Sequence, residues 1–273
     1  MQTTFFPDNN ISFEHIEFFR KNGYLHFKNF ISKDQVNIFL AELKSVSDHI
    51  FTNNIKKVNG VPLKFGIDAN GDKVIQRLAF ATKYSDVLSE FLKDKRFESL
   101  FDLLGNYEGR IGEFEKDGLV VNHYENTPLS NFKQLGWHTD SPRDLFLGSR
   151  IMPMLNVGVH LDDYPKDNGG LRVLPGTHRQ NLYQLFFRKK YFVDNNSDPN
   201  EVGFDIEAGD LTIHDGNLWH RVQRSLYVGE KSRRRVMYIP IVTGRVSIKH
   251  ARSKTPIYHR LGQLTYANIK FQS

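Results

Sequence analysis

Two polar residues in the stretch LGWHTDSPRD (residues 135–144) have the types and spacing of metal ligands. His138 and Asp140 point the same way only where the backbone is extended, because side chains alternate along a strand. A histidine on a later strand would complete a set of two imidazoles and one carboxylate. Such a set occupies one face of an octahedral ion and leaves positions open for substrate and oxygen, as in non-haem Fe(II) oxygenases.

The phrase GDLTIHDGNLWH (residues 209–220) contains two candidates for the third ligand. Gly209 begins a new strand and His220 closes the hairpin, so the spacing favours His220. His214 is the alternative ligand; otherwise we expect it beside the site or in the core. Of the remaining polar motifs, Asn168-Gly169-Gly170 is typical of a turn before a strand.

The chain has 273 residues and no cysteine, which excludes disulfides, thiolate catalysis and zinc–thiolate sites. This composition fits a reducing cytoplasm. The N-terminus MQTTFFPDNN lacks the basic start and apolar stretch of a secretory signal, and no apolar run reaches the roughly 18 residues of a membrane span. The sequence therefore predicts a soluble, cytoplasmic protein without a membrane segment.

Lys and Arg outnumber Asp and Glu by 37 to 31, giving a formal net charge of +6. This mild excess fits an ordinary solvated surface, but basic residues cluster in EKSRRRVMY and in IKHARSKTPIYHR, which could attract an anionic small-molecule substrate or a carrier-bound one. The chain has neither a helix-turn-helix phrase nor the interleaved aromatics of an RNA-binding sheet, so nucleic acid is not an expected partner.

The elements that must position these residues change in character near residue 109. Before it, helical periodicity covers SFEHIEFFRKNG, the Ser32–Gln35 capping box with its following residues, and YSDVLSEFLKDKRFESLFDLLG, which ends at Gly105. After it, short β-rich segments separated by turns predict a sandwich or barrel. We expect one domain: helical support (1–108), a β-core (109–245) with a lid-like insert (181–203), and a C-terminal extension (246–273).

In order and spacing, these phrases resemble the phytanoyl-CoA dioxygenase family of Fe(II)/2-oxoglutarate-dependent oxygenases. FFRKNGYLHFKNFISKDQV is similar to the family's N-terminal helix–strand–helix, and WHTD to its first metal motif. DNGGLRVLPGTH is similar to the central turn–strand–turn, GDLTIHDGNLWH to the strand bearing the second metal histidine, and RRRVMYIPIV to the last strand. The resemblance covers nearly the whole chain.

The resemblance implies a mainly β fold, a double-stranded β-helix (jelly roll, cupin-like), with N-terminal helices. It makes His138, Asp140 and His220 the Fe(II) ligands and Arg234 the partner of the distal carboxylate of 2-oxoglutarate. Arg233 and Arg235 are fallback choices, although alternation puts them on the opposite face from Arg234.

Three further side chains are candidate contacts of co-substrate or substrate. Asn122 and Tyr124 would face the cavity, with His123 facing away, although core packing explains them equally well. His160 stands where the family commonly has a small residue. The activity implied is O2-dependent hydroxylation of an unactivated C–H bond, with succinate and CO2 as co-products. Two alternatives remain open: a cupin-like metalloenzyme that does not use 2-oxoglutarate, and a jelly-roll binding protein.

Overall fold

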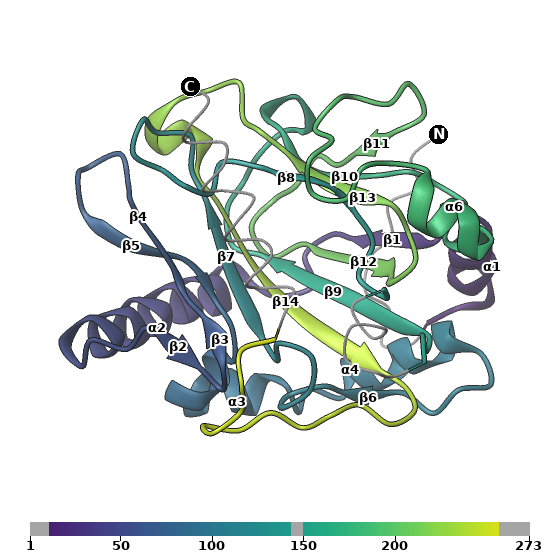
Figure 1. The fold of residues 1–273 in the computed structure, drawn as a ribbon, viewed down its shortest axis with the longest axis horizontal. Coiled ribbons are helices and arrows are strands. Elements are labelled where there is room, and N and C mark those ends of the chain that lie inside the picture. The colour runs from purple at the N-terminus through teal and green to yellow at the C-terminus, as the bar shows by residue number, and fades with distance from the viewer. Residues whose placement is uncertain (1–10, 143–149, 257–273) are drawn as a thin grey trace.

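Two antiparallel β-sheets face each other in the protein, whose computed structural model describes residues 11–142 and 150–256 (Figure 1). The major sheet has eight strands in the order β1-β12-β9-β14-β7-β5-β4, with β6 beside β14; the minor sheet is β11-β10-β13-β8. The major-sheet strands are β1 (Tyr24–Phe27), β4 (Lys64–Ile67), β5 (Lys73–Leu78), β6 (Arg110–Ile111), β7 (Val120–Tyr124), β9 (Met154–His160), β12 (Leu211–Asp215) and β14 (Arg234–Val242). The minor-sheet strands are β8 (Leu135–His138), β10 (Gly170–Val173), β11 (Val202–Gly203) and β13 (His220–Gln223), and a small hairpin joins β2 (Lys57–Val58) to β3 (Val61–Pro62).

Successive strands in the second half of the chain cross between the sheets. The chain passes from β8 in the minor sheet to β9 in the major sheet, back to β10 and β11, and then through β12, β13 and β14. This is the predicted jelly roll. The crossing places the end of β8 and the start of β13 side by side in the minor sheet, with β9, β12 and β14 opposite them.

The helices before β6 follow local sequence signals in part. Ser32 and Gln35 form the predicted capping box at the start of α2, and Gly23 ends α1 in the left-handed conformation (φ 81°). The segment before Gly105 was expected to be one helix but is broken, because the Asp94 carboxylate accepts the Arg96 main-chain N–H and competes with helical bonding. The helices are α1 (Phe13–Asn22), α2 (Lys33–Thr52), α3 (Asp86–Phe91), α4 (Arg96–Ser99) and α6 (Leu182–Phe187), with 3-10 turns η1 (Ala81–Tyr84), η2 (Leu100–Leu104), η3 (Lys166–Asn168), η4 (Thr177–Arg179) and η5 (Gly229–Ser232).

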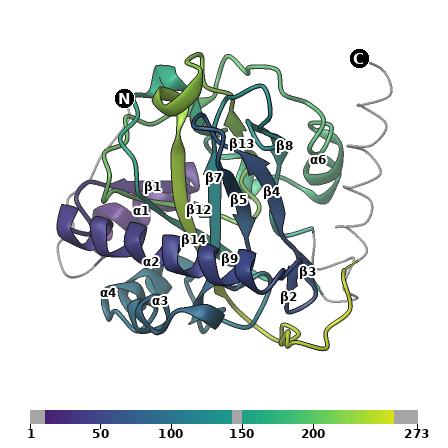
Figure 2. The same ribbon diagram turned by 90° about the vertical axis from the view of Figure 1, so that its left-hand side faces the viewer.

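The outer face of the major sheet carries the main hydrophobic core. Helix α2 crosses this face, and Figure 2 shows it lying over the strands. Residues that alternate outward along the strands, such as Leu25, Val157, Ile213 and Ile239, are buried in one cluster with Phe39 of α2. Burying this apolar surface supplies the dominant favourable free energy of folding, which leaves the opposite face of the sheet free to carry polar groups.

The inner face of the major sheet is unusually polar for a sandwich interior. Register pairs His214 with Asn156, Val236 with His160, and Arg234 with Tyr124, and directly opposed residues share a face. Buried polar groups are costly unless they have partners, so a polar interior facing the minor sheet marks the region where function is expected.

The predicted insert, residues 181–203, contains α6 and ends in β11, which pairs with the edge of β10. Of the predicted C-terminal extension, residues 257–273 lie outside the described part. Among the described helices, none is both long and apolar enough to span a membrane.

Candidate metal centre and adjoining pocket

His138 and His220 are direct partners in the β8–β13 ladder, and their ring centroids lie 4.1 Å apart. Each Nδ1 lies within hydrogen-bond distance of a main-chain carbonyl two residues earlier: 2.8 Å to Gly136 for His138 and 2.9 Å to Leu218 for His220. A carbonyl can only accept, so each Nδ1 carries the proton and each Nε2 keeps its lone pair. This is the tautomer that binds a metal through Nε2.

Asp140 follows β8 and is held by the turn between β12 and β13. The main-chain N–H groups of Asp140 and Ser141 both donate to the Gly216 carbonyl, at 2.8 and 3.0 Å. Asn156 donates its side-chain N–H to Asp140 Oδ2 at 3.0 Å, and that oxygen lies 3.7 Å from His220 Nε2. Main-chain bonds therefore hold the Asp140 backbone in place, and Asn156 orients its carboxylate.

Within the described residues, one ligand atom each from His138, Asp140 and His220 lies within 4.8 Å of the others, and all three residues are buried. Burial, together with the neighbouring rings of His138 and His214, holds the pKa of His220 well below its ordinary value, so the imidazole is neutral. Two imidazoles that present Nε2 and one carboxylate on one side of a site fit Fe(II) in the facial arrangement.

His214, the alternative ligand, lies beside this cluster. Its ring centroid is 4.2 Å from that of His220, and its Nε2 is 3.6 Å from Asp140 Oδ2. Among the described residues, neither ring nitrogen, both of which are buried, has a hydrogen-bond partner. The structure therefore brings both histidines of GDLTIHDGNLWH to the same place, with His220 facing His138.

Arg234 points into the sandwich, whereas its two neighbours point out of it. Arg233 pairs with Glu125 and Glu230, and Arg235 pairs with Asp162. Arg234 is 2 % exposed and donates to two main-chain carbonyls, those of Gln223 (2.7 Å) and Lys133 (3.4 Å). Its Nε is buried without a partner, and no described carboxylate lies within ion-pair distance of its guanidinium.

A pocket adjoins Arg234 between the two sheets. Its polar lining comes from Tyr124, His160, Tyr164 and Tyr238, with Leu171 and Val222 on the minor-sheet side. A buried cation without an anionic partner is costly, so a ligand carboxylate would complete this pocket. Metal ligands and an arginine without a described carboxylate partner are the two kinds of group that a 2-oxo dicarboxylate such as 2-oxoglutarate would need.

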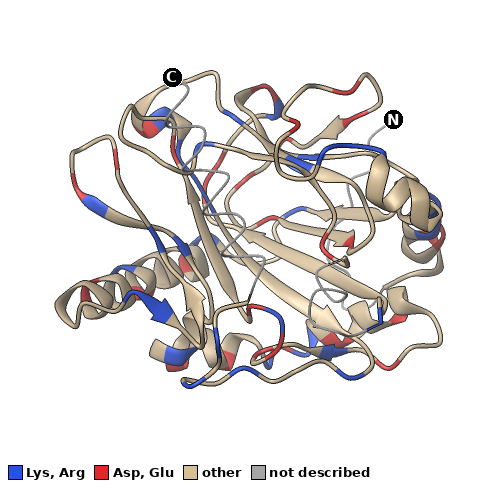
Figure 3. Cartoon of the chain, viewed as in Figure 1, with Lys and Arg blue, Asp and Glu red and all other residues tan. Residues whose placement is uncertain are grey.

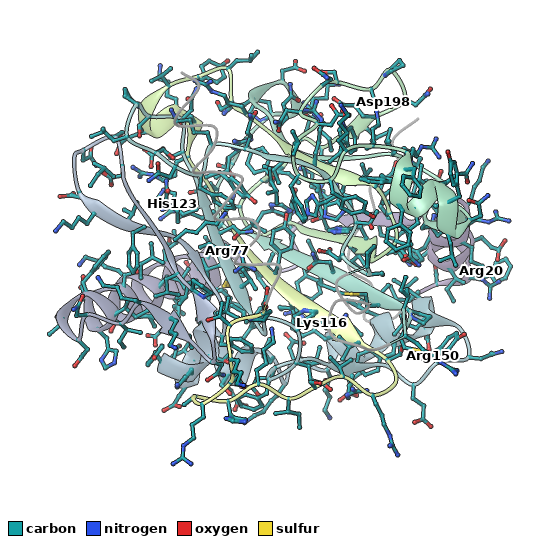
Figure 4. The ribbon with its side chains drawn as sticks, viewed as in Figure 1. Arg20, Arg77, Lys116, His123, Arg150 and Asp198 are labelled. Atoms are coloured by element: carbon teal, nitrogen blue, oxygen red, sulfur yellow. The ribbon has the colours of Figure 1, made fainter. Side chains whose placement is uncertain are left out.

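The remaining predicted contacts have mixed positions. Tyr124 and His160 line the pocket with Arg234. Asn122 is buried and donates to the Tyr124 hydroxyl at 3.3 Å, but it is not part of the pocket lining. His123 (labelled in Figure 4) lies 2.9 Å from Glu125 on the opposite face of β7, as alternation predicted.

Sequence reasoning missed four side chains of this region: Asn156, Tyr164, Phe192 and Tyr238. A signal existed for Asn156, since Asn156 and His160 share a face of β9 by alternation. Tyr164 comes after the strand and is positioned by an isolated bridge to Ile206, which no local pattern indicates.

The insert packs directly on the ligand strand. The Trp137 N–H donates to the Asp194 carbonyl and the Phe192 N–H to the Trp137 carbonyl, at 2.8 and 2.9 Å. Phe192 stacks on the His138 ring with centroids 4.9 Å apart. The outer end of the insert is tied back by Lys189, whose ammonium lies 2.7 Å from Asp198 (labelled at the upper edge of Figure 4). The second half of the insert therefore lies against β8 and is held there by main-chain hydrogen bonds and by the stacking of Phe192 on His138.

The arginines of the basic cluster EKSRRRVMY (residues 230–238) make their contacts within the protein. Its three consecutive arginines are either buried or paired with carboxylates, as described above, and Figure 3 shows basic and acidic segments interleaved around the molecule. Arg233 and Arg235 of this cluster are therefore paired within the protein, and Arg234 is its arginine without a described carboxylate partner. The second cluster extends into residues outside the described part.

Comparisons with known proteins agree with this geometry. A curated relative, phytanoyl-CoA dioxygenase 1 of Oryza sativa subsp. japonica, is 25% identical over 256 residues, covering 79% of this chain and 84% of the relative. The solved carbocyclase SnoK from nogalamycin biosynthesis, described as non-haem and α-ketoglutarate-dependent, superposes with a TM-score of 0.61 at 17% identity, over 89% of this chain and 88% of that one.

HygX from Streptomyces hygroscopicus, solved with nickel and 2-oxoglutarate bound, superposes with a TM-score of 0.58 at 16% identity, over 85% of this chain and 87% of that one. At such identities the two solved structures establish the jelly-roll fold. The family itself follows from a match of residues 19–225 to the phytanoyl-CoA dioxygenase (PhyH) model. The chain belongs to the phytanoyl-CoA dioxygenase family.

Proposed function

We propose that this protein is an Fe(II)- and 2-oxoglutarate-dependent dioxygenase that hydroxylates an unactivated C–H bond of a small-molecule substrate. One observation carries the proposal: the sandwich that holds the His138, Asp140 and His220 cluster also buries Arg234, which has no carboxylate partner among the described residues. A metal-ligand cluster alone, or a buried arginine alone, would suit proteins of many functions. Together they provide for both ends of a 2-oxo dicarboxylate.

Each residue has a distinct task in this proposal. His138, Asp140 and His220 hold Fe(II), and Arg234 binds the distal carboxylate of 2-oxoglutarate through its unpaired N–H groups. When bound, Fe(II) supplies the O2 chemistry that couples decarboxylation of 2-oxoglutarate, to succinate and CO2, to insertion of one oxygen atom into a C–H bond. The carbonyls of Gly136 and Leu218 fix the two imidazoles in the binding tautomer.

In this proposal, Phe192 and the insert that carries it exclude water from the metal-ligand cluster. Phe192 covers one face of the His138 ring, and the insert that carries it is bonded along β8. A dry, shaped cavity prevents side reactions of the reactive species. We propose that α6 and the rest of the insert border the substrate entrance. Hydroxylation is the simplest outcome, although the related SnoK is described as a carbocyclase, so the same fold serves other oxidations.

The test is an anaerobic titration of the metal-free protein with Fe(II) and then with 2-oxoglutarate, following the visible charge-transfer band of the chelate. We expect the band in the wild type and its loss or strong weakening in His220→Ala and Arg234→Ala. Arg233→Ala is the matched control, because Arg233 adjoins Arg234 in sequence but pairs with Glu125 outside the sandwich. It should retain the band.

Two other results would each replace the proposal. Iron binding without the band, unaffected by Arg234→Ala, would indicate a cupin-like metalloenzyme that does not use 2-oxoglutarate. Absence of any iron binding would indicate a jelly-roll binding protein. If the band forms, candidate small molecules can be screened by substrate-dependent release of succinate.

A further inference from the structure

A chain of three hydrogen-bonding side chains runs from β12 of the major sheet to the pocket beside Arg234. Thr212 Oγ1 lies 2.9 Å from His160 Nε2, and His160 Nδ1 lies 3.0 Å from the Tyr164 hydroxyl. All three residues are buried. His160 and Tyr164 both line the pocket that Arg234 shares.

His160 is the group that sets the direction of this chain. Burial lowers the pKa of His160 to about 3, so its imidazole is neutral and has one donor and one acceptor nitrogen. If Nε2 carries the proton, it donates to Thr212, and Tyr164 must donate to Nδ1. If Nδ1 carries the proton, Thr212 donates to Nε2, His160 donates to the Tyr164 oxygen, and the Tyr164 hydrogen is left to donate elsewhere.

The first arrangement leaves a polar group unsatisfied. Among the described residues, His160 is the one hydrogen-bond partner of the Thr212 hydroxyl, so a Thr212 that accepts from His160 has a buried hydrogen with no acceptor. In the second arrangement every donor is used, provided that the Tyr164 hydrogen finds an acceptor. Burial raises the pKa of Tyr164, so that hydrogen stays in place. Buried donors without acceptors are costly, so an acceptor in the pocket selects the second arrangement.

Two glycines make room for Tyr164 and Arg234 at this point. A Cβ on Gly170 would lie 2.5 Å from the Tyr164 ring, and a Cβ on Gly169 would lie 2.6 Å from Arg234 Nη1. Both glycines have positive φ, of 89° for Gly170 and 83° for Gly169. The Asn168-Gly169-Gly170 turn thus has a second role besides turning the chain, because it lets a tyrosine and an arginine reach one pocket.

We propose that Tyr164 donates a hydrogen bond to the same distal carboxylate that Arg234 binds, and that His160 is the positioning residue that holds Tyr164 in the donating orientation through an Nδ1–H. This inference rests on the proposed use of 2-oxoglutarate. It assigns His160 a role behind Tyr164 rather than a direct contact with substrate or co-substrate.

The test compares two ligands that share the chelating end and differ at the distal end. 2-Oxoglutarate has a distal carboxylate, and 2-oxopentanoate ends in a methyl group. Dissociation constants are measured anaerobically in the Fe(II)-loaded full chain by the chelate band. Tyr164→Phe should raise the dissociation constant of 2-oxoglutarate by about 10- to 100-fold, the size expected for loss of a hydrogen bond to a charged group. The dissociation constant of 2-oxopentanoate should not change. Tyr107→Phe, at an exposed tyrosine, is the matched control and should change neither constant.

His160 variants test the positioning role. In His160→Asn the side-chain amide can still donate toward Tyr164, whereas His160→Leu offers no donor. We expect His160→Leu to lose discrimination between the two ligands as Tyr164→Phe does, and His160→Asn to recover most of it. If His160 had only a structural role, both variants would bind both ligands more weakly and to the same extent. That result would overturn the assignment of His160.

A measurement on the wild type avoids any question of folding in the variants. Nitrogen-15 NMR of the Zn(II)-loaded, histidine-labelled protein with 2-oxoglutarate should show His160 protonated at Nδ1, with its signal identified by its absence in His160→Asn. Protonation at Nε2 in the bound state would overturn the inference.

The two proposals fail in different ways. Wild-type protein that does not bind 2-oxoglutarate would overturn the proposed function and this inference together. Wild-type protein that binds 2-oxoglutarate, with Tyr164→Phe binding it equally well, would overturn this inference alone.

Discussion

His138 and His220 are directly opposed residues of two antiparallel strands, and this single pairing brings their rings to a centroid separation of 4.1 Å. The pair comes from residues far apart in the chain, so its geometry depends on the β8–β13 register. A slip of one residue would turn one of the imidazoles to the other side of the sheet. The carbonyls of Gly136 and Leu218 then set the rotation of each ring.

The first prediction is that His220 of β13 is a metal ligand and that His214 of β12 is not, so that their variants differ in metal affinity. His220→Ala removes a ligand, and we expect its affinity for Co(II) to fall by more than the roughly 10- to 100-fold that loss of a residue supporting a ligand costs. His214→Leu should bind Co(II) nearly as tightly as the wild type, because His138, Asp140 and His220 all remain. Co(II) absorption measures both. A comparable loss in His214→Leu would identify His214 as a ligand.

The second prediction concerns backbone strain beneath the His138 ring. Phe192 has φ 61°, a left-handed conformation that is rare for a bulky side chain, and it stacks on His138. Phe192→Gly and Phe192→Ala both remove the ring, but only glycine relieves the backbone. We therefore expect the glycine variant to be more stable than the alanine variant by about 1 kcal/mol, measured by denaturant unfolding of the metal-free protein. The usual order, with alanine more stable, would show that the backbone there is not strained.

The third prediction uses two glycines with nearly the same positive φ. Gly170 and Gly71 have φ of 89° and 88°, but a Cβ on Gly170 meets the Tyr164 ring, whereas a Cβ on Gly71 has nothing within 4 Å. Gly71→Ala measures the cost of a positive φ where a Cβ has open space around it, about 1–2 kcal/mol. Gly170→Ala should cost more, because Tyr164 must move. It should also weaken 2-oxoglutarate binding, which Gly71→Ala should leave unchanged. If Gly170→Ala and Gly71→Ala lost the same stability, the Tyr164 ring would be able to move away from the new Cβ without an energetic penalty.

Sequence patterns predicted local features best. The Ser32–Gln35 capping box depends on residues three apart, and alternation on β14 correctly separated inward Arg234 from Arg233 and Arg235. The jelly roll and the family followed from the order of several motifs rather than from any one of them. These features need little knowledge of tertiary contacts.

The remaining features depend on contacts that single-chain patterns do not encode. Tyr164 reaches the pocket only because it bridges to Ile206 and because Gly170 leaves space for its ring. Phe192 has no sequence signal for a left-handed backbone, and its position follows from its hydrogen bond to Trp137. The break before Arg96 arose from one aspartate that competed with helical bonding. In each case tertiary structure decided between local alternatives.

The last prediction links His160 to the pH dependence of stability. The pKa of His160 is lowered to about 3 in the folded protein because the ring is buried, whereas an unfolded histidine titrates near 6.5. The unfolded chain therefore takes up this proton first as the pH falls, and the folded protein loses stability below about pH 6.5. Between pH 7.5 and 5.5 the contribution amounts to about 1.4 kcal/mol.

His160→Asn removes this titration, so the difference in unfolding free energy between wild type and variant should shift in the variant's favour by about that amount over the same range. Denaturant unfolding of the two metal-free proteins at several pH values measures it, and the other histidines cancel in the difference. A difference that stays constant with pH would mean that the His160 ring accepts a proton in the folded state. In that case its Nδ1 and Nε2 would both donate, and the ordered chain from Thr212 to Tyr164 would have no fixed direction.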